Sequence, residues 1–198
     1  MAFITRLSKS SKLLCVLCLT AAPLAAAEGI FATRTQAVLS DSGALAVSSR
    51  FRTELPDQLR QALNQGVPLT FTLSWQLSEP TLAAYKFKIA QLVSDENSIQ
   101  YKLAFQPLTN RYRVSVGTFS TEYDTLDSAL RGVGAVANWR VAGKGSLGGV
   151  KAQEVKAEVR LQLSTDRLPK PFQINALTSK SWRLDSGWKR LKVTRSGG

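Results

Sequence analysis

Cations and tryptophans interleave near the end of the chain, where residues 180–195 contain six lysine or arginine residues and one acid, Asp185. An indole ring tolerates partial burial and attracts a neighbouring cation, so this combination is typical of contact with an anionic surface. The candidate residues for binding an anionic partner are Lys180, Trp182, Arg183, Trp188, Lys189, Arg190 and Lys192.

The same residues also fit a structural role, in which the tryptophan rings close the core and the cations face solvent. Trp182 and Trp188 are six residues apart, so a regular strand would place both rings on one face. The sequence Asp185-Ser-Gly187 between them predicts a turn that interrupts such a strand. The two roles are compatible, because rings can point inward while cations point outward.

Positive charge is concentrated in the last third of the sequence. The whole chain has 26 lysine and arginine residues against 14 aspartate and glutamate residues, a net charge of +12. Residues 28–130 carry nine basic and ten acidic residues, whereas residues 131–198 carry 14 basic and four acidic residues. An imbalance of this size bears on partners and solubility. It predicts an anionic partner for the last third, with a merely solvated basic surface as the alternative.

The sequence lacks the residues that several classes of catalysis require. The sequence has no histidine, and its only cysteines are Cys15 and Cys18, in an N-terminal segment that we expect to be removed. Thiol chemistry, most metal sites and histidine-based triads are therefore excluded from the mature chain. The glycine-rich segment 143–149 lacks the residue order of a phosphate-binding loop and predicts a flexible hairpin loop.

We expect no enzymatic activity and assign no catalytic, cofactor-binding or metal-binding residue. The alternative is a hydrolase that uses paired carboxylates or a Ser/Lys dyad, for which no local motif selects the residues. A structure would support that alternative through a concave pocket with two convergent acids or a buried lysine beside a serine.

The N-terminal segment has the three parts of a secretory signal peptide. Arg6, Lys9 and Lys12 precede an apolar run over residues 13–19, and Ala25 and Ala27 supply small residues before the expected cleavage site. The apolar run is well below the roughly 20 residues that span a bilayer. We therefore predict a cleaved signal over residues 1–27, a periplasmic product, and a single β-rich domain over residues 28–198.

Alternation of apolar and polar residues with a period of two dominates the mature chain and predicts half-buried strands. The alternating segments are residues 45–51, 69–77, 85–89, 99–105, 112–116 and 155–163. Because one face of each strand is polar, the pattern favours antiparallel sheets with a core between them.

Two segments follow a helical period instead. Residues 56–65 begin with Pro56 and end before Gly66, which predicts a short helix. Residues 124–136 predict a second helix, capped by Asp124. The proline-containing segment 168–172 predicts a rigid extended crossover between strands. The expected fold is α+β, mostly antiparallel β in a two-layer, sandwich-like arrangement with two short helices.

A series of segments resembles a known family when order and spacing are considered together. These segments are Glu54-Leu-Pro-Asp57, Ala62-Leu-Asn-Gln-Gly66-Val-Pro-Leu69, Leu108-Thr-Asn-Arg-Tyr112-Arg-Val114, Asp124-Thr-Leu-Asp-Ser-Ala-Leu130 and Leu168-Pro-Lys-Pro-Phe172-Gln-Ile-Asn-Ala-Leu177, followed by Trp182 and Trp188. Over residues 30–193 the chain is similar to an exported proteobacterial family described as domain of unknown function 4390.

The resemblance implies no activity, cofactor or catalytic residue, because none is assigned to the family. The sequence departs from the family at Leu82-Ala-Ala-Tyr85, where relatives are richer in tryptophan. Family members are often encoded beside a two-component sensor kinase and its response regulator. The resemblance therefore implies, as one alternative, a modulator of a sensor kinase's extracytoplasmic domain.

The sequence favours an exported, non-enzymatic binding module of the cell envelope. Its basic C-terminal third would meet an anionic envelope component or a protein partner, with peripheral contact to the membrane surface compatible with the charge. We expect no nucleic-acid partner after export.

Overall fold

The computed structural model describes residues 29–78 and 98–196. The expected signal segment 1–27 lies outside these residues. So do the expected strand 85–89 and the segment 82–85, where the sequence departs from the family it resembles.

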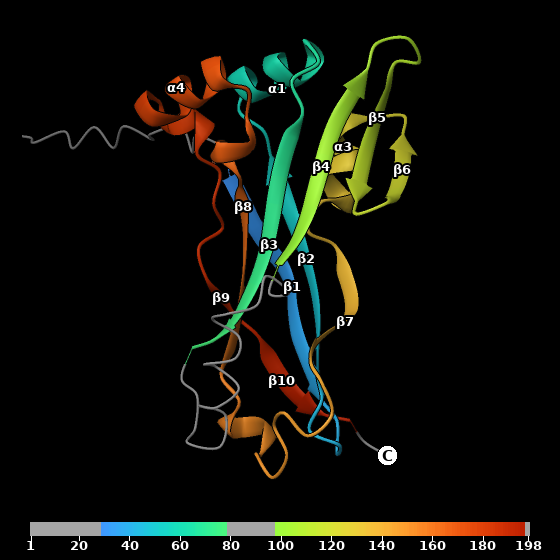
Figure 1. Cartoon of the computed structure of the whole chain (residues 1–198), viewed down its shortest axis with the longest axis vertical. Helices are drawn as coiled ribbons and strands as arrows, with labels where there is room; N and C mark the ends of the chain where they lie inside the picture. Colours follow the sequence, from blue (N-terminus) through green and yellow to red (C-terminus); the bar gives the residue numbers. More distant parts are fainter. Residues whose placement is uncertain (1–28, 79–97, 197–198) are drawn as a thin grey trace, which may run out of the picture.

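Two sheets face each other across the core (Figure 1). The four-stranded sheet has the order β10-β1-β2-β7, with β1 (Gly29–Leu39), β2 (Leu45–Glu54), β7 (Val136–Ala142) and β10 (Lys192–Arg195). The six-stranded sheet has the order β6-β5-β4-β3-β8-β9, with β3 (Leu69–Leu77), β4 (Ser98–Gln106), β5 (Arg111–Val116), β6 (Phe119–Tyr123), β8 (Ala157–Leu163) and β9 (Lys189–Arg190). Neighbouring strands are antiparallel except β1 and β10.

The alternating residues of the strands form the core, as their period predicts. Phe51 of β2 is buried on the inner face of the four-stranded sheet, while Phe71 of β3 and Leu161 of β8 are buried on the inner face of the six-stranded sheet. The outward residues of β3 and β8, such as Thr72 and Arg160, are polar. The predicted α+β class, with mostly antiparallel strands in two layers, is confirmed.

The two sheets are joined along one side by the last two strands. β9 pairs with β8 in the six-stranded sheet, and β10 pairs with β1 in the four-stranded sheet. Between them lies Leu191, which is buried and donates its backbone N–H to Ala157 O at 2.8 Å. A single buried leucine therefore marks where the chain passes from one sheet to the other.

The first predicted helix is confirmed as α1 (Asp57–Asn64), with Leu59, Ala62 and Leu63 buried. The second is α3 (Leu126–Gly132), which is shorter than predicted and ends before Gly134, a glycine with a φ of +73°. The expected capping by Asp124 is wrong. Thr125 is the N-cap, and its side chain accepts the Ser128 N–H, while Asp124 forms an ion pair with Arg111.

A third helix, α4 (Lys170–Thr178), replaces the extended crossover that we predicted around Pro169 and Pro171. Both prolines lie at the start of the helix, where their missing N–H groups would have no intrahelical acceptor. The Pro169 carbonyl oxygen accepts the N–H groups of Phe172 and Gln173, and these hydrogen bonds form the first turn of the helix. Short 3₁₀ turns follow other strands and helices, namely η2 (Ala152–Glu154), η3 (Thr165–Arg167) and η4 (Lys180–Trp182).

The glycine-rich segment 143–149 packs against the turn between β1 and β2. Gly145 N donates to Ser42 O at 2.6 Å, Leu147 N donates to Gly43 O at 3.0 Å, and the Leu147 side chain is buried. A Cβ added at Gly43 would lie 2.6 Å from Gly148 N. The segment thus closes one end of the four-stranded sheet. Within the described ranges, every helix is too short or too polar to cross a membrane.

Candidate anion-binding site

The outer face of the four-stranded sheet carries two facing arginines. On β2, Phe51 points into the core, so its neighbour Arg50 points outward and is exposed. Arg34 of β1 is the cross-strand partner of Arg50 and is also exposed. The two guanidinium groups therefore extend from adjacent positions on the same surface.

Irregularities in strand pairing hollow this surface. The register between β1 and β2 shifts between Ala32 and Arg34, and Thr33 Oγ1 there donates to Arg50 O at 3.0 Å. The register between β2 and β7 shifts next to Ser48, whose Oγ accepts the Asn138 N–H at 3.1 Å. Bulges of this kind bend a strand and redirect its side chains.

The result is a groove of about 390 Å³, which we call the two-arginine groove. It is lined by Arg34, Ser48, Ser49, Arg50 and Asn138 together with residues 135–137. The Ser48 hydroxyl already accepts the Asn138 N–H, which leaves its proton available as a donor.

Two hydrogen bonds from buried side chains support one wall of the two-arginine groove. The Tyr101 hydroxyl donates to Ala135 O at 3.2 Å, and burial raises the pKa of Tyr101 to about 12. The hydroxyl is therefore a neutral donor throughout the physiological range. Ser49, also buried, donates its hydroxyl to Gly134 O at 3.3 Å. These two bonds fix the backbone that forms one wall of the groove.

The electrostatics of the groove favour an anion over a cation. Arg34 Nε donates to Gln36 Oε1 at 3.0 Å, and neither Arg34 nor Arg50 has a carboxylate oxygen within 4 Å among the residues described. Like charges directly opposite on neighbouring strands destabilise a sheet unless something compensates them. A bound anion would supply that compensation, since guanidinium groups match carboxylate and phosphate oxygens.

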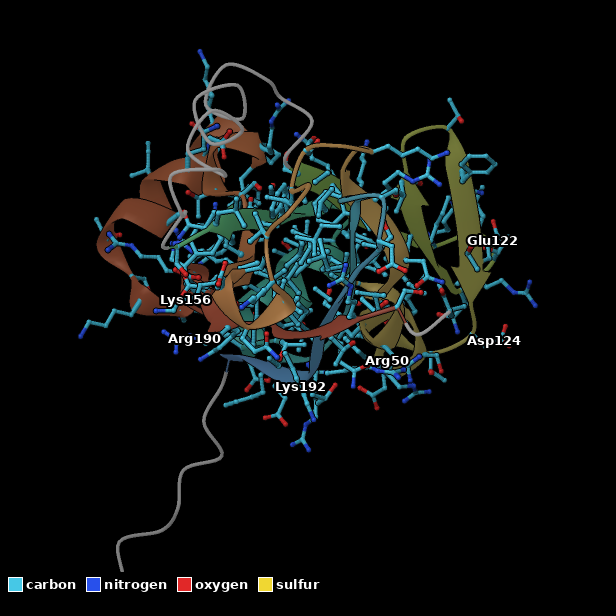
Figure 2. The ribbon with its side chains drawn as sticks, turned by 90° about the horizontal axis from the view of Figure 1, so that it is seen from below. Arg50, Glu122, Asp124, Lys156, Arg190 and Lys192 are labelled. Carbon is cyan, nitrogen blue, oxygen red and sulfur yellow. The ribbon has the colours of Figure 1, made fainter. Side chains whose placement is uncertain are left out.

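Besides Arg52, which is paired with Glu54, two further cations share the outer face. Lys192 of β10 is the partner of Gln36, and Arg140 of β7 is the partner of Ala46. Both side chains are exposed. Figure 2 shows Lys192 and Arg50 on the same side of the molecule, with Glu122 and Asp124 on another side at the β5–β6 hairpin. The face around the groove is therefore positive.

The structure separates the seven residues that the sequence predicts as anion contacts. Lys192 lies on the outer face of the four-stranded sheet, whereas Lys189 and Arg190 lie on β9 at the edge of the six-stranded sheet. Trp188 is 38% exposed and lies under the Arg160 guanidinium, 5.9 Å from ring centroid to Cζ. Of these four residues, Lys192 shares the sheet face of the two-arginine groove.

The other three predicted residues lie at the helical end of the fold. Trp182 is buried and donates its indole N–H to Gln58 Oε1 at 2.9 Å. Arg183 Nε donates to Ala176 O at 3.0 Å, and Lys180 is exposed on the adjoining 3₁₀ turn. Arg34 and Arg50 are absent from the predicted set because they belong to the part of the chain without net positive charge.

Two carboxylates, those of Glu54 and Asp127, line another cavity. This cavity, of about 260 Å³ between β2 and α3, is lined by Arg52, Glu54, Asp127 and Arg131, with Thr53 and Leu130. Glu54 is bound by Arg52, so this carboxylate already has a cationic partner. In the described part of the chain, no group of three or more Asp, Glu, His or Cys residues is arranged to hold a metal ion.

Comparison with known proteins identifies a family for the chain. A family model described as "Domain of unknown function (DUF4390)" matches residues 27–192. No curated protein and no solved structure matches the chain.

Proposed function

The chain belongs to the DUF4390 family, and we propose that it is an exported binding module whose two-arginine groove holds an anionic group of a cell-envelope component. The observation that carries the proposal is the facing pair Arg34 and Arg50, exposed and without a carboxylate partner among the described residues. Two other arginines of the same sheet do have carboxylate partners: Arg52 pairs with Glu54, and Arg195 pairs with Asp41.

The donors of the groove favour phosphate or carboxylate. Two guanidinium groups offer planar pairs of N–H donors, and the Ser48 hydroxyl adds a neutral donor between them and β7. Lys192 and Arg140 extend the positive field beyond the groove. An extended anionic surface, such as a bilayer of acidic lipids, would engage both the groove and these flanking cations.

The test measures binding to vesicles that contain phosphatidylglycerol, with vesicles of phosphatidylcholine alone as the neutral reference. The double variant Arg34→Gln/Arg50→Gln should bind the acidic vesicles at least about tenfold more weakly. The matched control Lys144→Gln/Lys151→Gln removes the same charge from two exposed loop positions and should lose little. Binding of the native chain should fall as salt is added.

Equal losses in the two double variants would show that only net charge matters and would overturn the assignment to the groove. Binding by the native chain that ignores both salt and lipid charge would overturn the proposal as a whole. Export is tested separately, by N-terminal sequencing of the protein from the periplasmic fraction, where Glu28 is the expected first residue.

A further inference from the structure

A third cavity, of about 410 Å³, lies between α1 and the segment formed by α4 and η4. Figure 1 shows α1 and α4 side by side at one end of the molecule. Three glutamines of the α1 segment line one wall, namely Gln58, Gln61 and Gln65, and we call this space the glutamine cavity. Their spacing of three and four residues places them on one side of the helix.

Among the described residues, those that line the glutamine cavity carry no ionisable side chain. Opposite the glutamines lie Phe172, Thr178 and Ser179, and the buried Trp182 closes the base. This composition is unusual for a chain with 26 basic and 14 acidic residues. A charged ligand would lose its hydration there without gaining a partner of opposite charge, so the cavity favours an uncharged polar ligand.

Gln58 is held in one orientation by its neighbours. Its Oε1 accepts the Trp182 indole N–H at 2.9 Å and the Ser181 hydroxyl at 2.6 Å, and Ser181 Oγ lies 2.7 Å from Ser179 Oγ. An indole N–H can only donate, so the amide oxygen must face Trp182. The two N–H donors of the Gln58 amide have no hydrogen-bond partner in the described chain. Because the amide oxygen is fixed by Trp182 and Ser181, the orientation of these donors is fixed as well, and a bound acceptor could use them.

An aromatic surface accompanies these polar groups. The rings of Phe172 and Trp182 pack with centroids 5.5 Å apart, and Phe172 remains partly exposed at the cavity wall. The cavity therefore combines oriented amide groups, hydroxyl groups and the face or edge of a ring. Sites for small ligands have this mixture of apolar lining and few fixed polar groups.

We propose that the glutamine cavity binds a neutral carbohydrate. Sugar hydroxyls both donate and accept hydrogen bonds, as the amides of Gln61 and Gln65 do, and the C–H face of a sugar ring can pack on Phe172. An extended peptide fits less well, because the cavity is bordered by helices and offers no strand edge to pair with. This site is independent of the two-arginine groove.

The experiment follows the Trp182 indole N–H in two-dimensional ¹⁵N–¹H spectra while maltotriose or chitotriose is added to the full chain. One of the two sugars should shift this signal saturably. Gln61→Ala/Gln65→Ala should weaken that binding roughly tenfold by removing two hydrogen-bonding amides. The matched control Gln100→Ala/Gln153→Ala removes two exposed glutamines elsewhere and should bind as the native chain does.

Gln61 and Gln65 are exposed, so their replacement should leave the melting temperature close to that of the native chain. The absence of a saturable shift with both sugars would overturn the proposal. So would native-like binding by Gln61→Ala/Gln65→Ala, or a stronger response of the Trp182 signal to inorganic phosphate or to an uncharged serine-rich peptide.

Discussion

Arg34 and Arg50 face each other across the β1–β2 ladder as direct cross-strand partners. We predict that Arg50→Gln stabilises the protein by about 0.2–1 kcal/mol, because it removes a like-charge contact on one face of the sheet. The same substitution should weaken binding to acidic vesicles. Urea unfolding and vesicle binding, measured on one preparation, check the two effects together. A variant that is less stable than the native chain would contradict the idea that the pair is strained.

The two C-terminal strands should contribute unequally to anion binding. Lys192 shares the outer face of the four-stranded sheet with the two-arginine groove, whereas Lys189 lies on the six-stranded sheet. Lys192→Gln should therefore weaken binding to phosphatidylglycerol vesicles several-fold more than Lys189→Gln, although both remove one charge. Equal effects would indicate that the six-stranded edge belongs to the binding surface as well.

The buried hydroxyl of Thr53 has no hydrogen-bond partner among the described residues. Thr53→Val keeps the shape of the side chain and removes an unsatisfied polar atom, so we expect a gain of about 1 kcal/mol in the free energy of unfolding. Thr72→Val is the control, because Thr72 Oγ1 lies 2.6 Å from Ser164 Oγ and its loss should destabilise the protein. Denaturant unfolding of both variants checks the sign of each effect.

Asp185 links acid stability to one ion pair. The Arg160 guanidinium donates to this carboxylate, with Nε at 2.8 Å, and lowers the pKa of Asp185, assisted by the Gly187 N–H and by the charges of Arg160 and Lys189. A folded-state pKa below the unfolded one means that Asp185 stabilises the fold above about pH 4. That contribution is lost as the pH falls through the folded-state pKa.

Asp185→Asn should therefore be less stable than the native chain at pH 7, by about 1 kcal/mol because the pair is partly exposed. The difference should shrink as the pH falls from about 4. Unfolding curves at a series of pH values check this. Asp166→Asn, which breaks a more exposed ion pair with Arg167, should change stability less at pH 7. A pH-independent difference for Asp185→Asn would contradict the electrostatic explanation.

Gly134 permits close packing between the end of α3 and the core. A Cβ at this position would lie 2.6 Å from Leu161 Cδ2 and 3.1 Å from Phe51 Cδ2, and the residue has a φ of +73°. Gly134→Ala should cost about 2–4 kcal/mol of unfolding free energy. At Gly66, with a φ of +89° and open space around the Cβ position, alanine should cost only about 1 kcal/mol. Thermal or denaturant unfolding separates the two costs.

Strands β2, β3, β4, β5 and β8 and helix α1 were predictable because their patterns are local. Val159 and Leu161 alternate with Glu158 and Arg160, and that period is the same whether or not the partner strand is known. The α4 helix was not predictable in this way. Prolines such as Pro169 and Pro171 suit either an extended segment or a first helical turn, and the packing of the residues after them decides between the two.

The candidate site was less predictable than the strands. Arg34 and Arg50 are 16 residues apart, and each is an ordinary outward residue within its own strand. Only the register of β1 against β2, with its shift beside Arg34, makes them neighbours. In the C-terminal third, the chain crosses from one sheet to the other at Leu191, so Lys189 and Arg190 lie on one sheet and Lys192 on the other. The net charge of the segment does not indicate this separation.

The pairing of β10 with β1 joins residues 36–39 to residues 192–195, the most distant segments of the described fold. During synthesis, the β10 side of β1 stays without this partner until residues 192–195 have been made. The four-stranded sheet is therefore completed only after every described strand of the six-stranded sheet has been made, because β10 follows β9 in the chain. Removal of residues 189–195 would leave open edges on β1 and β8 together, and unpaired edges of this kind promote self-association.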